Sequence, residues 1–347
     1  MQQTALFDDM GLVSPADGHL EPVGEQADIT YIEGRARTAL NDPAATGMGY
    51  WSINPYVGCA FGCAYCYARY AHRYKMARAV DAGASPDALP PWLAFERRIF
   101  VKSNIASVLR NALRHGGPKH LGLITGEWVV IGTATDPYQP AERRYRLTRG
   151  ALEVLAEHPG MRVAIITKSP LVTRDVDLLA RLARSGRMTV HLSLITLDRE
   201  LARRIEPRAP TPEARVRAVE RLRAAGVDVG INLMPVLPGI TDQPAALDAL
   251  IARVVQAGAT HVNAGSLRLR SDARQRYLSF IEAEFPELAA RYRATYAAGH
   301  EMGERYRAGL RRVVSRLCAA HGVPFGRSGD VPDTDEPVVS PQLELPV

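Results

Sequence analysis

Short β-branched segments alternate with longer segments of helical periodicity along most of this chain, and this alternation constrains its fold more than any other feature. Amphipathic helices are predicted at 141–158, 174–186, 211–226 and 243–258, where apolar residues recur at i, i+3 and i+4. The strand–helix repeat predicts an α/β fold, a partial (β/α)6 TIM-like barrel of parallel strands with outer helices. The six predicted strands are YWSIN (50–54), EWVVIGT (127–133), RVAIITK (162–168), MTVHLSL (188–194), DVGINLM (228–234) and THVNAGS (260–266).

Composition changes at both ends of this repeat and sets the expected domain boundaries. Residues 1–45 are polar, rich in Gly, Pro and Asp, and without a period, so a flexible N-terminal arm is predicted. The barrel is expected at 46–270 and a helical extension at 271–326. The remaining residues, 327–347, are rich in proline and lack an apolar rhythm, which predicts a disordered tail.

Three of the four cysteines lie within eight residues, just after the first predicted strand. They are Cys59, Cys63 and Cys66, in the spacing C-x3-C-x2-C. The N-terminus lacks the basic and apolar regions of a secretory signal, and no apolar run reaches the ~18 residues of a membrane span. A cytoplasmic protein without a membrane partner is therefore expected. In that reducing compartment, clustered thiols are more often metal ligands or redox groups than disulfides.

The cysteine spacing leaves three explanations open. Structural zinc takes four ligands, and His72 is the nearest candidate for the fourth. An iron–sulfur cluster held by three cysteines leaves one iron free to bind a substrate or cofactor, and amides near Gly58 and Gly62 can donate hydrogen bonds to its sulfurs. The third explanation is that the cysteines are unrelated small core residues.

Polar or Pro/Gly-rich segments follow the other predicted strands as well. In parallel α/β sheets, ligands gather at the C-terminal edge of the strands. One site is therefore expected to collect residues from all of these segments. They are TATDPYQPAE after the second strand, KS after the third, IEPRAP after the fourth and PVLPGITD after the fifth.

Several segments together resemble a known family. The cysteine spacing, with Tyr65 directly before Cys66, is similar to the signature of the radical SAM superfamily. The resemblance covers about residues 36–269 and implies that the three cysteines bind a [4Fe–4S] cluster whose open iron is chelated by S-adenosylmethionine. Reductive cleavage of this cofactor gives a 5′-deoxyadenosyl radical, which abstracts hydrogen from a substrate. SINPYVGCAFGCAYCYAR, GTATDPYQPAE, TKSPLVTRDVDLL and IEPRAPTPEARVRAVERLRAAGV resemble the subgroup of spore photoproduct lyase, whose members are often labelled DNA repair photolyases.

The resemblance also implies contacts with S-adenosylmethionine, one of them from Tyr65. Thr135 and Asp136 are expected near its amino group, with Asp136 as the charge partner of the ammonium. Alternatively, Asp136 only opens a turn. Ser193 is the expected partner of the ribose, and Gly239 is expected to let the chain pass close to the adenine.

Three cations near the predicted strand ends are candidates for anionic groups. Arg208 is the expected partner of the cofactor carboxylate, because its planar guanidinium suits bidentate pairing. Arg215 is the alternative, and Glu206 is a structural partner for either arginine. Lys168 is expected to face the cofactor or the substrate, unless it is simply solvated.

Tyr138 and Cys318 are candidate catalytic residues. Tyr138 belongs to a group of tyrosines expected at the mouth of the site, where they stack on bases, relay hydrogen atoms or pack around the cluster. The resembling family returns a hydrogen atom from a cysteine downstream of the cluster, and no cysteine lies between Cys66 and Cys318. Either Cys318 reaches the site, or a tyrosine substitutes, or the reaction differs. The helical spacing around Cys318 favours a buried apolar role.

The net charge of +6 is compatible with DNA or RNA as the substrate of repair or modification. A peptide or small metabolite is the alternative substrate, and flavodoxin or ferredoxin is the expected electron donor. A competing hypothesis is a non-catalytic binding protein that contains zinc or a cluster. The polar residues at the other strand ends argue against it, because a structural metal needs none of them.

Overall fold

The computed structural model describes residues 12–13, 22–26, 28–70, 89–115, 120–124 and 126–326. The strands are β1 (Leu12–Val13), β2 (Pro22–Gln26), β3 (Ile29–Ala36), β4 (Trp51–Ile53), β5 (Tyr56–Val57), β6 (Arg98–Lys102), β7 (Trp128–Ile131), β8 (Arg162–Thr167), β9 (Arg187–Ser193), β10 (Asp228–Val236) and β11 (His261–Ser266). The helices are α2 (Pro43–Thr46), α4 (Pro91–Arg97), α5 (Ile105–His115), α6 (Leu121–Ile124), α7 (Glu142–Tyr145), α8 (Leu147–Leu155), α9 (Val176–Ser185), α10 (Arg199–Ile205), α11 (Pro212–Ala224), α12 (Pro244–Gln256), α13 (Ser271–Glu284), α14 (Pro286–Thr295) and α15 (Glu304–Ala320), with the 3-10 helices η1 (Tyr67–Arg69) and η3 (Pro170–Asp175).

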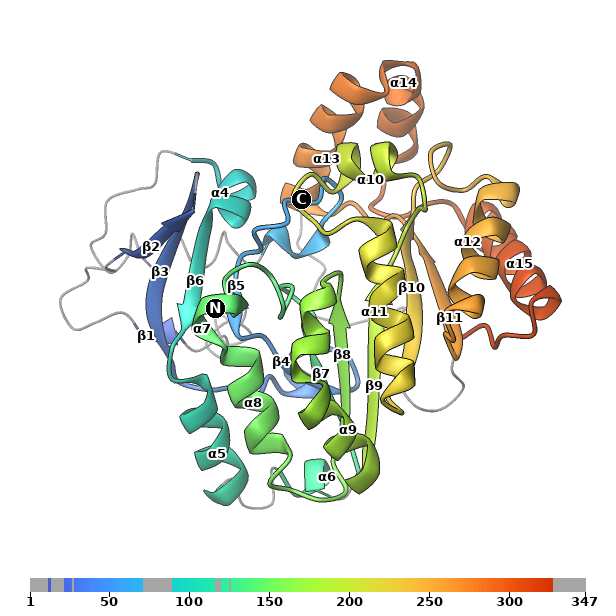
Figure 1. Ribbon diagram of the computed structural model, residues 1–347. Coiled ribbons are helices and arrows are strands. Elements are labelled where there is room, and N and C mark those ends of the chain that lie inside the picture. Colours follow the sequence, from blue (N-terminus) through green and yellow to red (C-terminus); the bar gives the residue numbers. More distant parts are fainter. Residues whose placement is uncertain are drawn as a thin grey trace.

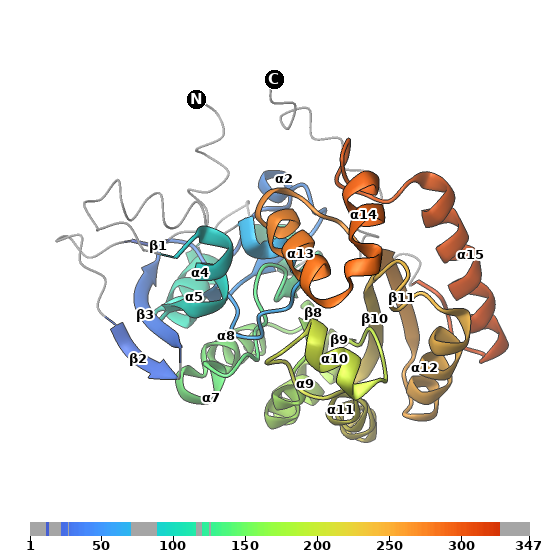
Figure 2. The same ribbon diagram turned by 90° about the horizontal axis from the view of Figure 1, so that it is seen from above.

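Six parallel strands form the central sheet, in the order β11-β10-β9-β8-β7-β4. Each strand pairs with its neighbour in the chain order of the repeat, and the helices α8, α9, α11 and α12 cover one face (Figures 1 and 2). The central strands are apolar on both faces, as in β7, where all four residues are buried. All six strands predicted from the sequence are present, and the prediction of a partial α/β barrel is confirmed.

The chain before the barrel differs from its prediction. Residues 29–36, which were expected to belong to a flexible arm, form β3. This strand pairs in parallel with β6 in a second sheet, where β1, β2 and β5 also pair. Ile29, Tyr31 and Ala36 are buried against the core. The apolar alternation in this segment is short and interrupted by Gly34, so pairing with a strand about 65 residues away, rather than local periodicity, stabilises it.

The predicted helix 141–158 is divided in two. Arg146 lies between α7 and α8 with φ 50° and ψ 34°, in the left-handed region. Among the described residues it is the one non-glycine residue with a positive φ. Arg146 therefore occupies a bend between the two helices, and its side chain is exposed.

Three helices follow the barrel. α13 packs on α4 and η1, beside the cysteine-containing segment, and α14 packs on α13. α15 lies on the outside, against α12 and the edge strand β11 (Figure 2). The backbone after α15 continues this edge, because the Val262 N–H donates to the Pro324 carbonyl at 2.9 Å. No helix in the described part of the chain is long and apolar enough to cross a bilayer.

Candidate functional site

The cysteine loop (residues 58–66) follows β5 and needs glycine at two positions. Gly58 has φ 91° and Gly62 has φ 66°. A Cβ at Gly58 would lie 2.7 Å from the carbonyl oxygen of Phe95, which is too close for any side chain. The loop therefore packs directly against the backbone that leads from α4 into β6.

The cysteines sit where this loop meets the barrel. Cys59 and Cys63 are buried, and Cys66 is partly exposed. All four cysteines of the chain are free thiols. The backbone amides of Phe61 and Asp136 act to lower the pKa of the Cys59 thiol, against the effect of burial. Amide donors of this kind stabilise a thiolate that binds a metal centre.

Burial raises the pKa of the Cys59 thiol to about 12 and that of Cys63 well above its ordinary value. Such thiols stay protonated at neutral pH unless the positive charge of a metal centre replaces the proton. No three His, Cys, Asp or Glu side chains in the described ranges converge on a single metal ion. A cubane needs no such convergence, because each cysteine binds a different iron. The donor set therefore fits a [4Fe–4S] cluster; His72, the candidate zinc ligand, lies outside the described residues.

Gln139 holds the cysteine loop to the segment after β7. Its Oε1 accepts from the Ala60 N–H at 2.9 Å, and its Nε2 donates to the Gly58 carbonyl at 3.1 Å. Thr135 donates its hydroxyl to the same carbonyl at 2.6 Å and accepts from Gln139 at 3.0 Å. The hydroxyl of Thr135, a predicted contact of the cofactor amino group, thus makes hydrogen bonds to Gly58 and Gln139 within the protein. Gln139 was missed by the sequence analysis, although it lies in the motif GTATDPYQPAE.

Arg208 lies between the cysteine loop and α4 and donates hydrogen bonds to both. Its Nε donates to the carbonyl of Ala60, and its Nη2 donates to the carbonyl of Glu96 at 3.2 Å. A Cβ at Gly62 would lie 2.7 Å from this Nη2 atom. Arg208 therefore uses two of its N–H donors to support the loop and α4, and its contact with the cofactor carboxylate stays a prediction.

Asp136 connects the ends of β7 and β8. Its Oδ1 accepts from the Thr167 hydroxyl at 2.7 Å and from the Tyr138 N–H at 2.9 Å, and its Oδ2 accepts from the Lys168 N–H at 2.8 Å. Burial raises the pKa of Asp136, although these donors oppose the rise. The hydrogen bond from the Tyr138 N–H is the contact expected if Asp136 opens a turn, which was the alternative prediction. Asp136 lies beside Cys59, at the edge where a cofactor amino group was expected.

A buried ionic group surrounds Tyr65, the residue before Cys66. The Tyr65 hydroxyl and the Arg215 guanidinium both donate to the carboxylate of Glu206. Arg215 also donates to the carbonyl of Ser193 at 3.0 Å. Burial would raise the pKa of Glu206, but Arg215 and Lys168 hold it below its ordinary value. Arg215 is thus fully used by the protein.

Lys168 lies beside Tyr65 and Glu206, and its ammonium can still bind an anion. Its ammonium lies 5.5 Å from the centre of the Tyr65 ring. Burial opposes its charge, yet Cys63 and Glu206 outweigh this effect and raise the pKa of Lys168. No hydrogen bond of the ammonium to another described residue is found. Lys168 can therefore meet an anionic group beside the cysteine loop, the role that the sequence analysis gave to Arg208.

Ser193 ends β9, and Gly239 follows the end of β10 on the same edge of the sheet. Ser193 is buried at the end of β9, in register with Asn232 of β10. Gly239 has φ 76°, and its N–H donates to Asp242 at 2.8 Å. The nearest atoms to a Cβ at Gly239 belong to Leu288, at 3.6 Å, so the turn conformation rather than close approach requires glycine here.

Two predicted catalytic residues lie away from the cysteine loop. Tyr138 is buried, with its ring 5.9 Å from the Arg174 guanidinium. Cys318 is buried on α15, in a core cluster that also contains Val314 of α15 and Val323 after it but not the three loop cysteines. α15 lies on the outside of β11 (Figure 2), which favours the buried apolar role of Cys318 over a role in the site.

Comparisons with known proteins agree with this arrangement. Residues 53–250 match the family described as the Radical SAM superfamily. An uncharacterised protein of Mycobacterium tuberculosis (strain ATCC 25618 / H37Rv) is 36% identical over 319 residues, 91% of this chain and 88% of the relative. A protein of Methanocaldococcus jannaschii, also uncharacterised, is 28% identical over 214 residues, 62% of this chain and 70% of the relative.

Among solved structures, a spore photoproduct lyase double mutant with bound AdoMet and dinucleoside spore photoproduct is similar in fold. Its TM-score is 0.63 at 15% sequence identity, with 90% of this chain and 88% of that chain covered. The chain therefore belongs to the radical SAM superfamily, whose enzymes use a [4Fe–4S] cluster and S-adenosylmethionine.

Proposed function

We propose that this radical SAM enzyme repairs or modifies a nucleic acid. The fold similarity that spans 90% of the chain supports this substrate class, since the similar structure holds a dinucleoside spore photoproduct. The net charge of +6 supports it as well, because the phosphates of a nucleic acid attract a basic protein. The similarity in fold is the observation that carries the proposal.

Some residues of the site would bind the cluster, and others would bind the cofactor or shield it from water. Cys59, Cys63 and Cys66 would hold the cluster, and Lys168 would bind the carboxylate of S-adenosylmethionine. When bound, these cofactors supply a 5′-deoxyadenosyl radical that takes a hydrogen atom from a substrate carbon and leaves as 5′-deoxyadenosine. Tyr65 and Phe61 pack in the buried cluster around the cysteines, where they exclude water from a reactive centre.

The position of Cys318 bears on how the reaction of the product radical ends. The chain has four cysteines, three of which are the proposed cluster ligands. Cys318 is on the outer helix α15, so the chain offers no cysteine to return a hydrogen atom to a product radical. We therefore favour a reaction that ends without a cysteine donor over simple reversal of a thymine photoproduct. The free thiols suit a reducing cytosol, where flavodoxin or ferredoxin would donate the electron.

The test uses protein purified and reconstituted with iron and sulfide without oxygen. Dithionite and S-adenosylmethionine are added, and 5′-deoxyadenosine is measured with and without single-stranded DNA, duplex DNA or RNA. We expect product from the wild type, stimulated by one nucleic acid, and none from the Cys59→Ala, Cys63→Ala, Cys66→Ala triple variant. Stimulation by a peptide or metabolite fraction instead, with no salt-sensitive nucleic-acid binding, would contradict the substrate class.

A further inference from the structure

An open pocket lies on the surface beside the segments that follow β7 and β8. It encloses about 510 Å³ and is lined by Arg143, Arg146, Leu171 and Arg174. Three of the four lining side chains are guanidinium groups, and none is a carboxylate. A hollow lined in this way suits an anion with several oxygen atoms, because each planar guanidinium presents parallel N–H donors.

Two of the three arginines have no partner in the part of the chain that the structure describes. Arg143 and Arg146 are exposed, and neither side chain makes a hydrogen bond or ion pair with another described residue. Arg146 also keeps φ 50°, a conformation in which glycine is the usual residue. Solvation alone explains an exposed arginine on a helix, but it does not explain an arginine at a left-handed position. A ligand at this bend would explain both features.

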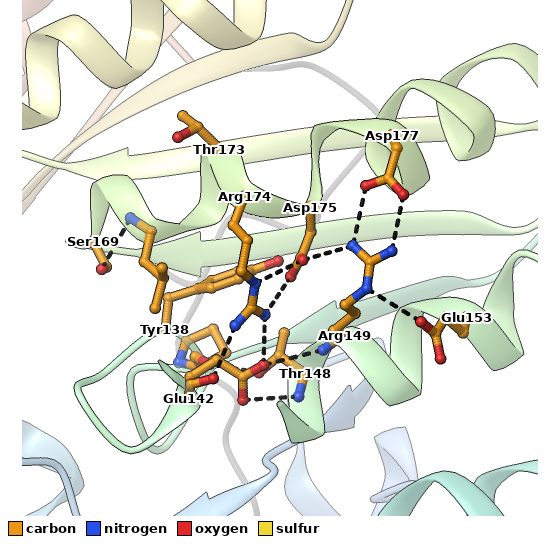
Figure 3. Close-up of polar contacts among 12 residues, drawn as sticks. Tyr138, Glu142, Thr148, Arg149, Glu153, Ser169, Thr173, Arg174, Asp175 and Asp177 are labelled. Atoms are coloured by element: carbon orange, nitrogen blue, oxygen red, sulfur yellow. Dashed lines mark hydrogen bonds and ion pairs between the residues drawn. The ribbon is translucent and has the colours of Figure 1, made fainter. Parts of the chain in front are cut away.

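The third arginine is fixed in place by buried carboxylates. Arg174 donates to Glu142 at 2.9 Å and to Asp175 at 2.7 Å, and both acids have fully buried side chains. Arg149 pairs with Asp175 and Asp177 on the far side, each at 2.9 Å (Figure 3). Arg149 also pairs with Glu153 at 3.2 Å, so all four acids of this network contact Arg149 or Arg174. Arg143 and Arg146 have no carboxylate within ion-pair distance among the described residues.

The pocket connects to the cysteine loop through short contacts. The Tyr56 hydroxyl, two residues before Gly58, donates to Glu142 at 2.6 Å. The Arg174 guanidinium lies over the ring of Tyr138, whose N–H donates to Asp136 at 2.9 Å. Because α7 and η3 both follow C-terminal strand ends, the pocket is on the same edge of the sheet as the candidate cofactor residues.

We propose that this arginine pocket binds a backbone phosphate of the nucleic-acid substrate, and thereby positions the strand while one nucleotide enters the site beside the cysteine loop. The inference rests on the proposed function. Phosphate contacts fix the register of a nucleic acid without reading its sequence. The pocket therefore contributes affinity that depends on salt and not on the base that reacts.

The test compares two charge-matched double variants. Arg143→Gln/Arg146→Gln removes the unpaired pocket charges. Arg110→Gln/Arg253→Gln removes the same charge from exposed ion pairs with Glu157 and Glu220, on α5 and α12. Binding of a fluorescent oligonucleotide is measured by anisotropy over a series of salt concentrations. Thermal unfolding and cofactor cleavage without nucleic acid, both expected to be unchanged in the pocket variant, check the fold.

We expect the pocket variant to bind about tenfold more weakly, with the slope of log K against log salt smaller in magnitude by about 1. The control variant should keep the wild-type slope. Arg143→Lys/Arg146→Lys should restore most of the slope, because a lysine keeps the charge but not the bidentate geometry.

Three outcomes would overturn the inference. If the wild type binds nucleic acid and both double variants bind equally well, the pocket plays no part while the proposed function stands. If the wild type shows no salt-dependent binding, both proposals fail. If inorganic phosphate stabilises the wild type but not the pocket variant, and the variant still binds the oligonucleotide normally, the pocket belongs to a small phosphate ligand.

Discussion

The Tyr65 hydroxyl donates a hydrogen bond to the carboxylate of Glu206, and this contact joins the cysteine loop to the residue that ends α10. The same carboxylate accepts from Arg215, which in turn reaches the carbonyl of Ser193 on β9. Residues more than 100 positions apart in the sequence thus hold the loop against the barrel. Tyr65 precedes Cys66, so the position of the third proposed cluster ligand depends on Glu206.

The Glu206→Gln variant tests this connection. Glu206 is 1% exposed, and removing one member of a buried ion pair leaves the other uncompensated, so we expect the free energy of unfolding to fall by about 3–5 kcal/mol. Urea unfolding of the apoprotein measures the loss. A fall of less than about 1 kcal/mol, as for exposed pairs, would show that Glu206 does not hold the loop.

The same variant gives a pH dependence with a definite sign. The pKa of Glu206 is lowered below its ordinary 4.5, so the unfolded chain binds the proton more tightly. Its contribution to stability is therefore fully present above pH 4.5 and is lost as the pH falls through the lowered pKa. We expect the difference between wild type and Glu206→Gln to shrink in that acidic window. A difference that grows on acidification would contradict the assignment.

Gln139→Leu tests the anchoring of the cysteine loop. The substitution keeps the volume but removes hydrogen bonds to Ala60, Gly58 and Thr135. Because buried backbone groups lose their partners, we expect about 1–3 kcal/mol less stability and less iron per chain after reconstitution. Gln139→Glu, which keeps one acceptor for the Ala60 N–H, should lose less iron. Equal iron in all three proteins would show that the loop does not need this anchor.

Lys168→Gln separates cofactor binding from cluster binding. We expect about 10- to 100-fold weaker binding of S-adenosylmethionine, the usual effect of losing a charged hydrogen bond, with the iron content unchanged. Arg208→Gln should give the opposite pattern, since Arg208 donates to the carbonyls of Ala60 and Glu96 and so supports the loop. Equilibrium dialysis and iron analysis of the reconstituted variants measure both effects. The reverse result would favour Arg208 as the carboxylate partner.

Cys318→Ala tests the position of the fourth cysteine. We expect normal formation of 5′-deoxyadenosine, normal iron content and about 1 kcal/mol less stability, because the change leaves a small cavity beside Val314 and Val323 on the outer helix. Loss of product formation in a variant that keeps its iron would show that Cys318 reaches the site.

The barrel could be predicted from the sequence because its signals are local. Each strand is a short β-branched run, and each helix repeats its apolar residues every three or four positions. The three cysteines were also visible, because ligands on one loop are close in sequence. β3 was not predicted, since its stability comes from pairing with β6, which lies about 65 residues away.

The roles of the charged residues depended on tertiary structure. From the sequence, Arg208 was the expected partner of the carboxylate, Arg215 was its alternative, and Lys168 was expected to face the cofactor or the substrate. The fold places Arg208 against the carbonyl of Ala60 and Arg215 against Glu206, and leaves Lys168 beside Tyr65. A guanidinium binds whichever acceptor the fold brings to it, and most of these acceptors are backbone carbonyls from distant segments. The sequence by itself therefore determined the fold class and the proposed cluster ligands, whereas the contacts of Arg208 with the loop and of Arg215 with Glu206 came only from the packing of the chain.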